Sequence, residues 1–90
     1  MHELERDVEI TNAGGLHVRP ISRIVEAASR FACEVVVIKE GQAVDAKSAL
    51  ELMLLAAANG TVLRLRCKGP DAPAAIETLA RLFQDRFGEE

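Results

Sequence analysis

The chain has 90 residues, 49% of them hydrophobic, and a formal net charge of −3 at pH 7. This length predicts one small domain spanning residues 1–90, with enough apolar material for a single core. The acidic balance and the absence of Trp and Tyr argue against a nucleic-acid-binding protein, which usually combines a basic face with stacking aromatic side chains.

The first predicted element is a strand over residues 4–11. Leu4, Val8 and Ile10 alternate with acidic residues, so this strand should have one apolar face and one solvated face. Arg6 interrupts the apolar face, and we expect its charged head to reach the edge of that face. A secretory signal would be basic and then apolar. The acidic start of the chain therefore predicts no signal peptide, and the sparse cysteines favour a cytoplasmic protein.

The segment 14–20, with the sequence GGLHVRP, joins this strand to a helix predicted over residues 18–29. The glycine pair permits a sharp turn. Pro20 fits only the first helical turn, where its missing N–H costs nothing. His17 is then the N-cap of a helix whose apolar residues recur at helical spacing: Ile21, Ile24, Val25 and Ala28.

The start of this helix has the features of an anion site. The amides of Val18 and Arg19 have no intrahelical acceptors, and the helix dipole favours negative charge there. The Arg19 guanidinium can bind phosphate oxygens, and a neutral imidazole nitrogen is a nucleophile. We therefore expect His17 to accept a phosphoryl group. The alternative is a surface histidine without function, because one histidine provides neither a metal site nor a catalytic triad.

A basic stripe follows the outer side of the same helix, formed by Arg19, Arg23 and Arg30. On an acidic protein such a stripe can steer an acidic partner towards His17. A merely solvated face is the alternative.

Residues 33–39 and 42–45 form a predicted hairpin with Glu40–Gly41 as its turn. Ser48 and Glu51 have the spacing of a capping box at the start of the next helix. This structural role explains both residues without a modification.

The next predicted helix, residues 49–55, is apolar nearly all round and too short to cross a membrane. Only about half of such a helix packs inward. Some of Ala49, Leu50 and Met53 are therefore expected to form a surface patch near His17, with core packing as the alternative for each.

Residues 61–68 form a final predicted strand, and a helix capped by Asp71 and ending at Gly88 is interpreted as purely structural. The order β-α-β-β-α-β-α predicts an α+β open-faced β-sandwich, a four-stranded sheet with three helices on one face. Cys33 and Cys67 fit no metal spacing. We expect reduced thiols and no metal or cofactor, with a disulfide left open.

Two segments, GLHVRP at residues 15–20 and AKSALELM at residues 46–53, resemble the active-site and regulatory-serine segments of the HPr family. This family comprises the histidine phosphocarriers of the bacterial phosphoenolpyruvate:sugar phosphotransferase system, and the resemblance covers essentially the whole chain. It implies an antiparallel sheet in the order first, fourth, second, third. The strands that carry Cys33 and Cys67 would then be neighbours.

The resemblance also implies a function. Phospho-enzyme I would donate to Nδ1 of His17, with Arg19 and the amides of Val18 and Arg19 binding the phosphate, and the group would pass to enzyme IIA-type acceptors. The chain would be a monomeric carrier and not an enzyme, and it would bind no nucleic acid and insert into no membrane. The expected docking residues are Val18, Pro20, Arg23, Lys47, Ala49, Leu50 and Met53.

In many members of this family the serine at the position of Ser48 is phosphorylated by a dedicated kinase, the HPr serine kinase/phosphorylase. The alternative function is accordingly a regulatory protein-binding module for carbon or nitrogen control. In that case phosphorylation, mainly of Ser48, would control binding to a partner such as a transcriptional regulator, without sugar uptake. Val18 and Ile21 depart from the common residues of the family, which bears on partner choice.

Overall fold

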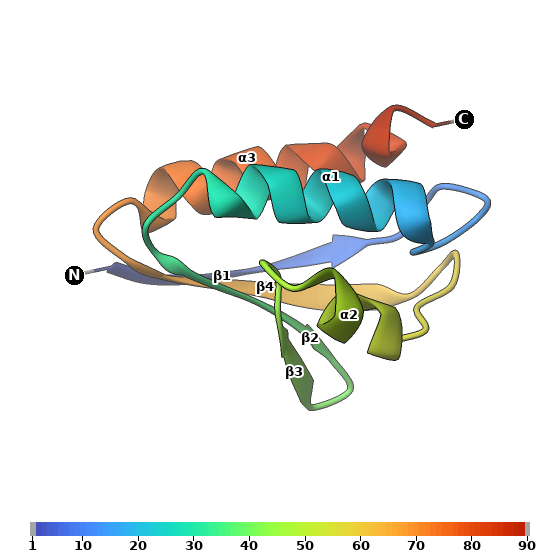
Figure 1. Ribbon diagram of the computed structural model, residues 1–90, viewed down its shortest axis with the longest axis horizontal. Coiled ribbons are helices and arrows are strands. Elements are labelled where there is room, and N and C mark those ends of the chain that lie inside the picture. Colours follow the sequence, from blue (N-terminus) through green and yellow to red (C-terminus); the bar gives the residue numbers. More distant parts are fainter. Residues whose placement is uncertain (1, 90) are drawn as a thin grey trace.

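The computed structural model describes residues 2–89, and its elements follow the predicted order (Figure 1). Four strands form one antiparallel sheet in the order β1-β4-β2-β3, which confirms the predicted fold and strand order. The elements are β1 (His2–Glu9), α1 (Val18–Ser29), β2 (Glu34–Lys39), β3 (Gln42–Asp45), α2 (Ala49–Leu54), β4 (Val62–Gly69), α3 (Ala72–Gln84) and a 3₁₀ turn, η1 (Arg86–Gly88).

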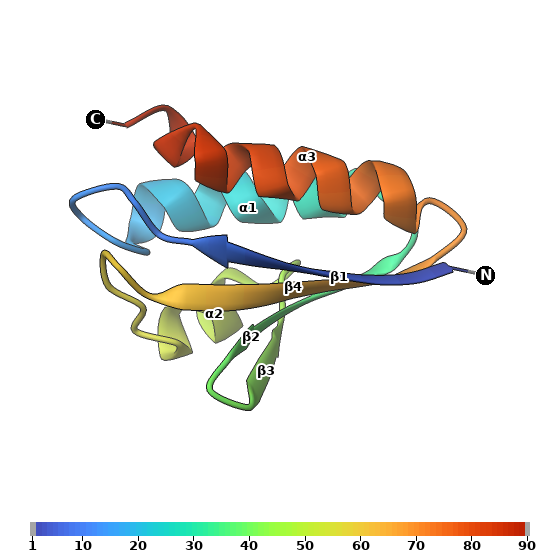
Figure 2. The ribbon, with the colours of Figure 1, turned by 180° about the vertical axis from the view of Figure 1, so that it is seen from behind.

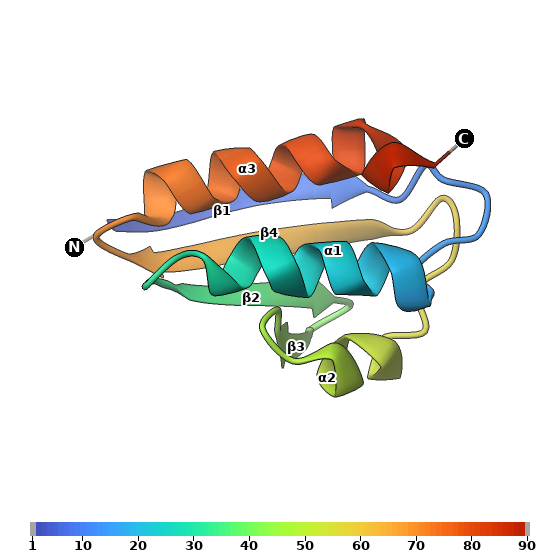
Figure 3. The ribbon, with the colours of Figure 1, turned by 45° about the horizontal axis from the view of Figure 1, so that its top comes forward.

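Helices α1 and α3 lie side by side over one face of the sheet, and α2 lies beside α1 near β3 (Figures 2 and 3). The core fills the space between these layers, with Ile24 of α1, Leu65 of β4 and Leu79 of α3 fully buried. Arg6 lies on the helix side of β1, and its guanidinium donates to Glu77 Oε2 of α3 at 3.1 Å. Its charged head therefore leaves the apolar face as predicted.

The opposite face of the sheet carries charged side chains. Arg64 of β4 lies 3.0 Å from Asp7 Oδ1 and 3.7 Å from Glu5 Oε1, both on the neighbouring strand β1. These pairs follow from the register, in which Asp7 is opposite Arg64, and cross-strand pairs of opposite charge stabilise a sheet modestly.

Asp71 has a different role from the predicted one. Its carboxylate does not cap α3; it accepts hydrogen bonds from the amides of Ala32 (2.8 Å) and Cys33 (2.9 Å). Both amides lie just before β2, where the sheet ladder has not yet begun. The carboxylate thus joins the start of α3 to the start of β2.

This contact predicts a pH-dependent contribution to stability. The hydrogen bond from Ala32, assisted by those from Cys33, lowers the pKa of Asp71 below 3.8 despite desolvation. A lowered folded-state pKa contributes stability above the unfolded pKa, and this stability is lost as pH falls through the folded pKa. Urea denaturation should therefore show Asp71→Ala less stable than the parent chain near neutral pH, with the difference closing at strongly acidic pH. A difference that persists undiminished in acid would contradict this assignment.

Cys33 and Cys67 are neighbours in the core, as the strand order implies, and both are unpaired thiols. Burial, with the adjacent Asp71, raises the pKa of Cys33 to about 11. Burial likewise raises the pKa of Cys67. Both side chains are therefore protonated at neutral pH and act as small apolar core residues.

Gly69 is required where β4 meets the segment before β2. Its φ is +146°, and a Cβ at this position would lie 2.7 Å from Cys33 Cβ and 2.9 Å from Cys33 Cα. Overpacking against backbone adds to the conformational strain, so Gly69→Ala should lower the free energy of unfolding by about 2–4 kcal/mol. Gly41→Ala is the matched control, because Gly41 also has positive φ but has no atom within 4 Å of the added Cβ. Equal losses in chemical denaturation would contradict the packing argument.

Candidate functional site

Three segments meet at one end of the molecule: the β1–α1 loop, the α2–β4 loop and the C-terminal turn (Figure 1). Backbone hydrogen bonds join the first two, from Leu16 N to Ala57 O (2.9 Å) and from Gly60 N to Ile10 O (2.7 Å). Gly15 lies at this crossing with φ +66°, and a Cβ there would lie 2.8 Å from Ala57 O. The glycine therefore permits the close approach that fixes the loop before His17.

His17 is the N-cap of α1, as predicted, with an extended backbone at φ −117° and ψ −169°. Its side chain makes no capping hydrogen bond and is 46% exposed. The imidazole is therefore available to a ligand or partner. The amides of Val18 and Arg19 are in the first turn, where a helix offers no intrahelical acceptor, so they can bind an anion beside the ring.

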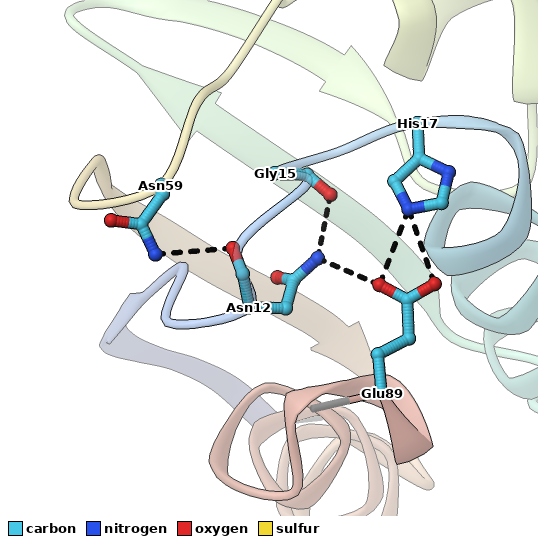
Figure 4. A network of polar contacts seen from close by, with 5 residues as sticks. All are labelled: Asn12, Gly15, His17, Asn59 and Glu89. Carbon is cyan, nitrogen blue, oxygen red and sulfur yellow. Dashed lines mark hydrogen bonds and ion pairs between the residues drawn. The ribbon is translucent and has the colours of Figure 1, made fainter.

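A network of polar contacts fixes the ring from one side (Figure 4). His17 Nε2 lies 3.2 Å from Glu89 Oε1 and 3.1 Å from Glu89 Oε2. Asn12 Nδ2 donates to the same Oε1 at 3.0 Å and to Gly15 O at 2.8 Å. Asn59 Nδ2 donates to the backbone oxygen of Asn12 at 3.1 Å. The loop, the ring and the C-terminal turn thus form one connected unit.

Sequence reasoning missed both Asn12 and Glu89. Asn12 is fully buried, although polar loop residues are usually exposed. Glu89 follows the last helix, which was interpreted as purely structural, and its contact with His17 spans 72 positions. No local pattern identifies such a contact.

Glu89 is ionised in this setting. Partial burial works against its charged form, but hydrogen bonds from His17 and Asn12, together with the charge of Arg19, outweigh burial and lower the pKa of Glu89. Arg19 is therefore close enough to act on this carboxylate. The Arg23 guanidinium lies against the C-terminal turn, because a Cβ at Gly88 would be 3.8 Å from Arg23 Cζ. Two of the three predicted stripe residues thus lie beside the site, whereas Arg30 pairs with Glu26 at 3.2 Å.

An exposed apolar surface, which we call the α2 patch, lies next to the site because α1 and α2 pack against each other. The predicted residues Leu50 and Met53 belong to it with exposed fractions of 71% and 49%, so core packing is wrong for both. Ala49 is also exposed. The patch extends to a residue that the prediction omitted, and its large side chains are Val18, Leu50, Met53 and Leu54.

Two predicted docking residues are placed differently. Pro20 is buried on the core side of α1, so its ring offers no surface to a partner. Lys47 is half-buried, and its ammonium donates to Phe31 O at 2.8 Å. That hydrogen bond ties the charge to the chain before β2.

Ser48 forms half of the predicted capping box. Its Oγ accepts from the Glu51 amide at 3.2 Å. The reciprocal bond is absent in this part of the chain, since Glu51 Oε1 accepts from Asp45 N at 3.0 Å and the Ser48 amide donates to Asp45 O at 3.1 Å. The tight turn after β3 therefore supplies the acceptor that the capping box would have supplied.

Residues 2–89 contain no cluster of three or more His, Cys, Asp or Glu side chains arranged to hold a metal ion. Of the helices that the structure describes, none is long and apolar enough to cross a membrane.

Comparisons with known proteins agree on one family. Residues 4–85 match the family described as "PTS HPr component phosphorylation site". The phosphocarrier protein HPr of Xylella fastidiosa is 40% identical over 87 residues, covering 97% of this chain and 98% of that protein. The HPr of Treponema pallidum is 41% identical over 85 residues, covering 94% and 97%. A crystal structure of HPr from Thermoanaerobacter tengcongensis superposes with a TM-score of 0.93 at 39% identity, covering 97% and 98%.

Proposed function

The chain belongs to the HPr family, the phosphocarriers of the phosphoenolpyruvate:sugar phosphotransferase system, and from this membership we propose that His17 carries the phosphoryl group. The observation that supports this assignment most directly is the placement of the ring. It is exposed at the N-terminus of the 12-residue helix α1, next to Arg19 and two first-turn amides. A family member of this kind is a phosphoryl carrier and not an enzyme.

The transfer uses Nδ1 of His17 as the nucleophile. Its lone pair forms a bond to phosphorus while the bond from phosphorus to the donor group of phospho-enzyme I breaks with its electron pair. The Arg19 guanidinium and the amides of Val18 and Arg19 neutralise the phosphoryl oxygens. Because these contacts are few and exposed, the group is not trapped in the ground state and can leave again. In the second transfer an enzyme IIA-type acceptor attacks the same phosphorus.

Both partners use the same surface. The α2 patch supplies buried contact area, and Arg19 and Arg23 supply positive charge beside it, which favours approach of acidic partners. Neither Pro20 nor Lys47 contributes directly, since the first is buried and the second is bound to Phe31. The cytoplasmic location expected from the sequence stays a prediction.

The test is a two-step relay with purified components. Phosphoenolpyruvate and enzyme I from the same organism should convert the chain to an acid-labile phosphoprotein. Addition of an enzyme IIA-type protein should then remove the label from the chain and place it on the acceptor. An acid-stable product, or a phosphoprotein that no acceptor discharges, would contradict the carrier function.

A second function, regulation through Ser48, is favoured by the position of this residue at the N-cap of α2, two residues before the exposed Leu50. A phosphate there adds a charge of about −1.5 to −2 beside the docking surface. Acidic partners would bind more weakly, while His17 would be unaltered.

Ser48→Asp tests this regulation, because aspartate retains the N-cap and adds negative charge. It should raise the KM of enzyme I for the chain several-fold, whereas Ser29→Asp, at the far end of α1, should leave that KM unchanged. Equal effects of both variants would contradict a local role of Ser48. If a serine kinase labels the chain and enzyme I does not, the chain functions as a regulatory protein-binding module and not as a phosphocarrier.

A further inference from the structure

The C-terminal turn has a strained backbone. Arg86, Phe87 and Gly88 follow one another with φ of 53°, 56° and 76°. The left-handed region is unfavourable for the two non-glycine residues, and such strain persists where the surrounding structure fixes it. Here the turn is held by hydrogen bonds from Gly88 N to Asp85 O (3.0 Å) and from Glu89 N to Arg86 O (2.8 Å).

Packing anchors the same turn. Phe87 is 1% exposed, and its ring meets that of Phe83 edge to face with centroids 4.8 Å apart. The positive φ of Arg86 and Phe87 ends the α-helical course of the chain before Glu89. The consequence is that Glu89 lies over the β1–α1 loop and its side chain, 18% exposed, lies between His17 and Asn12.

The contact with Glu89 determines which nitrogen of the His17 ring carries the proton. An ionised carboxylate only accepts hydrogen bonds, so Nε2 carries the proton that it shares with Glu89. The lone pair is then on Nδ1, which faces away from Glu89 (Figure 4). The backbone closes the same edge of the ring, since a Cβ at Gly14 would lie 3.0 Å from His17 Cδ2 and 3.1 Å from Nε2.

We propose that Glu89 is a positioning residue for phosphoryl transfer: it holds the Nε2–H of His17 and thereby directs phosphorylation to Nδ1. This inference rests on the proposed function of His17. When Nδ1 binds phosphorus and Nε2 keeps its proton, the ring gains positive charge. The Glu89 carboxylate stabilises that charge from the side opposite the phosphate, as carboxylates do for other histidines that react or bind metals through the second nitrogen.

The inference is tested without enzyme I, using phosphoramidate as the phosphoryl donor. In that reaction a bond forms between phosphorus and a ring nitrogen, the P–N bond of phosphoramidate breaks, and ammonia leaves. The intact chain should give the Nδ1 product, identified by NMR of ¹⁵N-histidine-labelled protein. Glu89→Ala should give a substantial share of Nε2 product. Asp85→Ala, which removes another carboxylate of the same segment, should keep the product of the parent chain.

Two further readouts cover the remaining outcomes. Before any phosphorylation, the Nε2–H proton of His17 should be observable by NMR in the parent chain and in Asp85→Ala, and lost to exchange in Glu89→Ala. With enzyme I, Glu89→Ala should lower kcat roughly tenfold with little change in KM, and Glu89→Gln, which keeps an acceptor oxygen, should recover part of the loss.

The inference is overturned if Glu89→Ala keeps both the Nδ1 product and the protected Nε2–H, or if it accelerates transfer, which would mean that the carboxylate competes with the phosphate. Failure of the proposed function gives a different pattern. In that case enzyme I does not label the parent chain, although Nε2–H is protected and dependent on Glu89.

Discussion

Replacing His17 by alanine should abolish formation of acid-labile phosphate from phosphoenolpyruvate and enzyme I. The reason is chemical, because the transfer needs a nucleophilic nitrogen at the N-terminus of α1 and no other imidazole lies in that part of the described structure. The fold should be unaffected, since the ring is exposed, makes no capping bond and contributes no core packing. Phosphate release in acid, measured by mass spectrometry before and after treatment, is the assay.

His2→Ala is the matched control for this experiment, because His2 is the other of the two histidines in the chain. It lies in β1 opposite Gly69, at the end of the molecule away from the site. This variant should be labelled as well as the parent chain. Acid-labile label that survives in His17→Ala and disappears in His2→Ala would reverse the assignment.

Leu50→Asp should raise the KM of enzyme I for the chain roughly 30-fold, which corresponds to about 2 kcal/mol of lost binding free energy. Leu50 has the highest exposed fraction among the large side chains of the α2 patch, 71%, so a partner that covers it buries a large apolar side chain. An aspartate there would need desolvation without a partner. The change should leave kcat nearly unaltered, because the residue does not contact the ring network.

Val62→Asp is the control for this second prediction. Val62 is also an apolar residue with a high exposed fraction, 59%, but it belongs to β4 outside the α2 patch. The KM of enzyme I for the Val62→Asp chain should stay within about twofold of the value for the parent chain. A comparable rise in KM for both variants, measured by the rate of pyruvate release at varied chain concentration, would show that the α2 patch is not the docking surface.

Most of the fold follows from local patterns in the sequence. Alternation and helical spacing place α1 at its observed bounds, Val18–Ser29, and β3 at Gln42–Asp45. The last helix is shorter than predicted, since α3 ends at Gln84 and the positive φ of Arg86 stops it. The order of the strands came only from the family resemblance, because periodicity carries no information on which strands pair.

The sequence predicted only some residues of the candidate site, and there is a physical reason why it located these and missed others. His17, Val18 and Arg19 belong to one continuous segment, so turn and helix signals locate them together. Asn12 and Glu89 reach the site through tertiary contacts 77 positions apart, and no local pattern encodes these. Asp71 shows the same limit. The sequence predicts that a carboxylate at a helix start accepts hydrogen bonds from backbone amides, but it does not show that the donors are the amides of Ala32 and Cys33.

The apolar helix α2 marks a further limit. Its sequence is apolar nearly all round, so it does not distinguish the residues that pack inward, Leu52 and Leu55, from the exposed Leu50 and Leu54. Only the way in which α2 is oriented on the rest of the fold makes that distinction. The surface that we propose for partner binding could therefore be defined only with the structure.

NMR of the enzyme I product with ¹⁵N-labelled histidine tests directly whether the phosphoryl group resides on Nδ1 of His17. We predict a phosphorus–nitrogen coupling at Nδ1 of His17, with Nε2 unphosphorylated and His2 unchanged. Phosphate on Nε2 of His17, on His2 or on a hydroxyl such as that of Ser48 would contradict it.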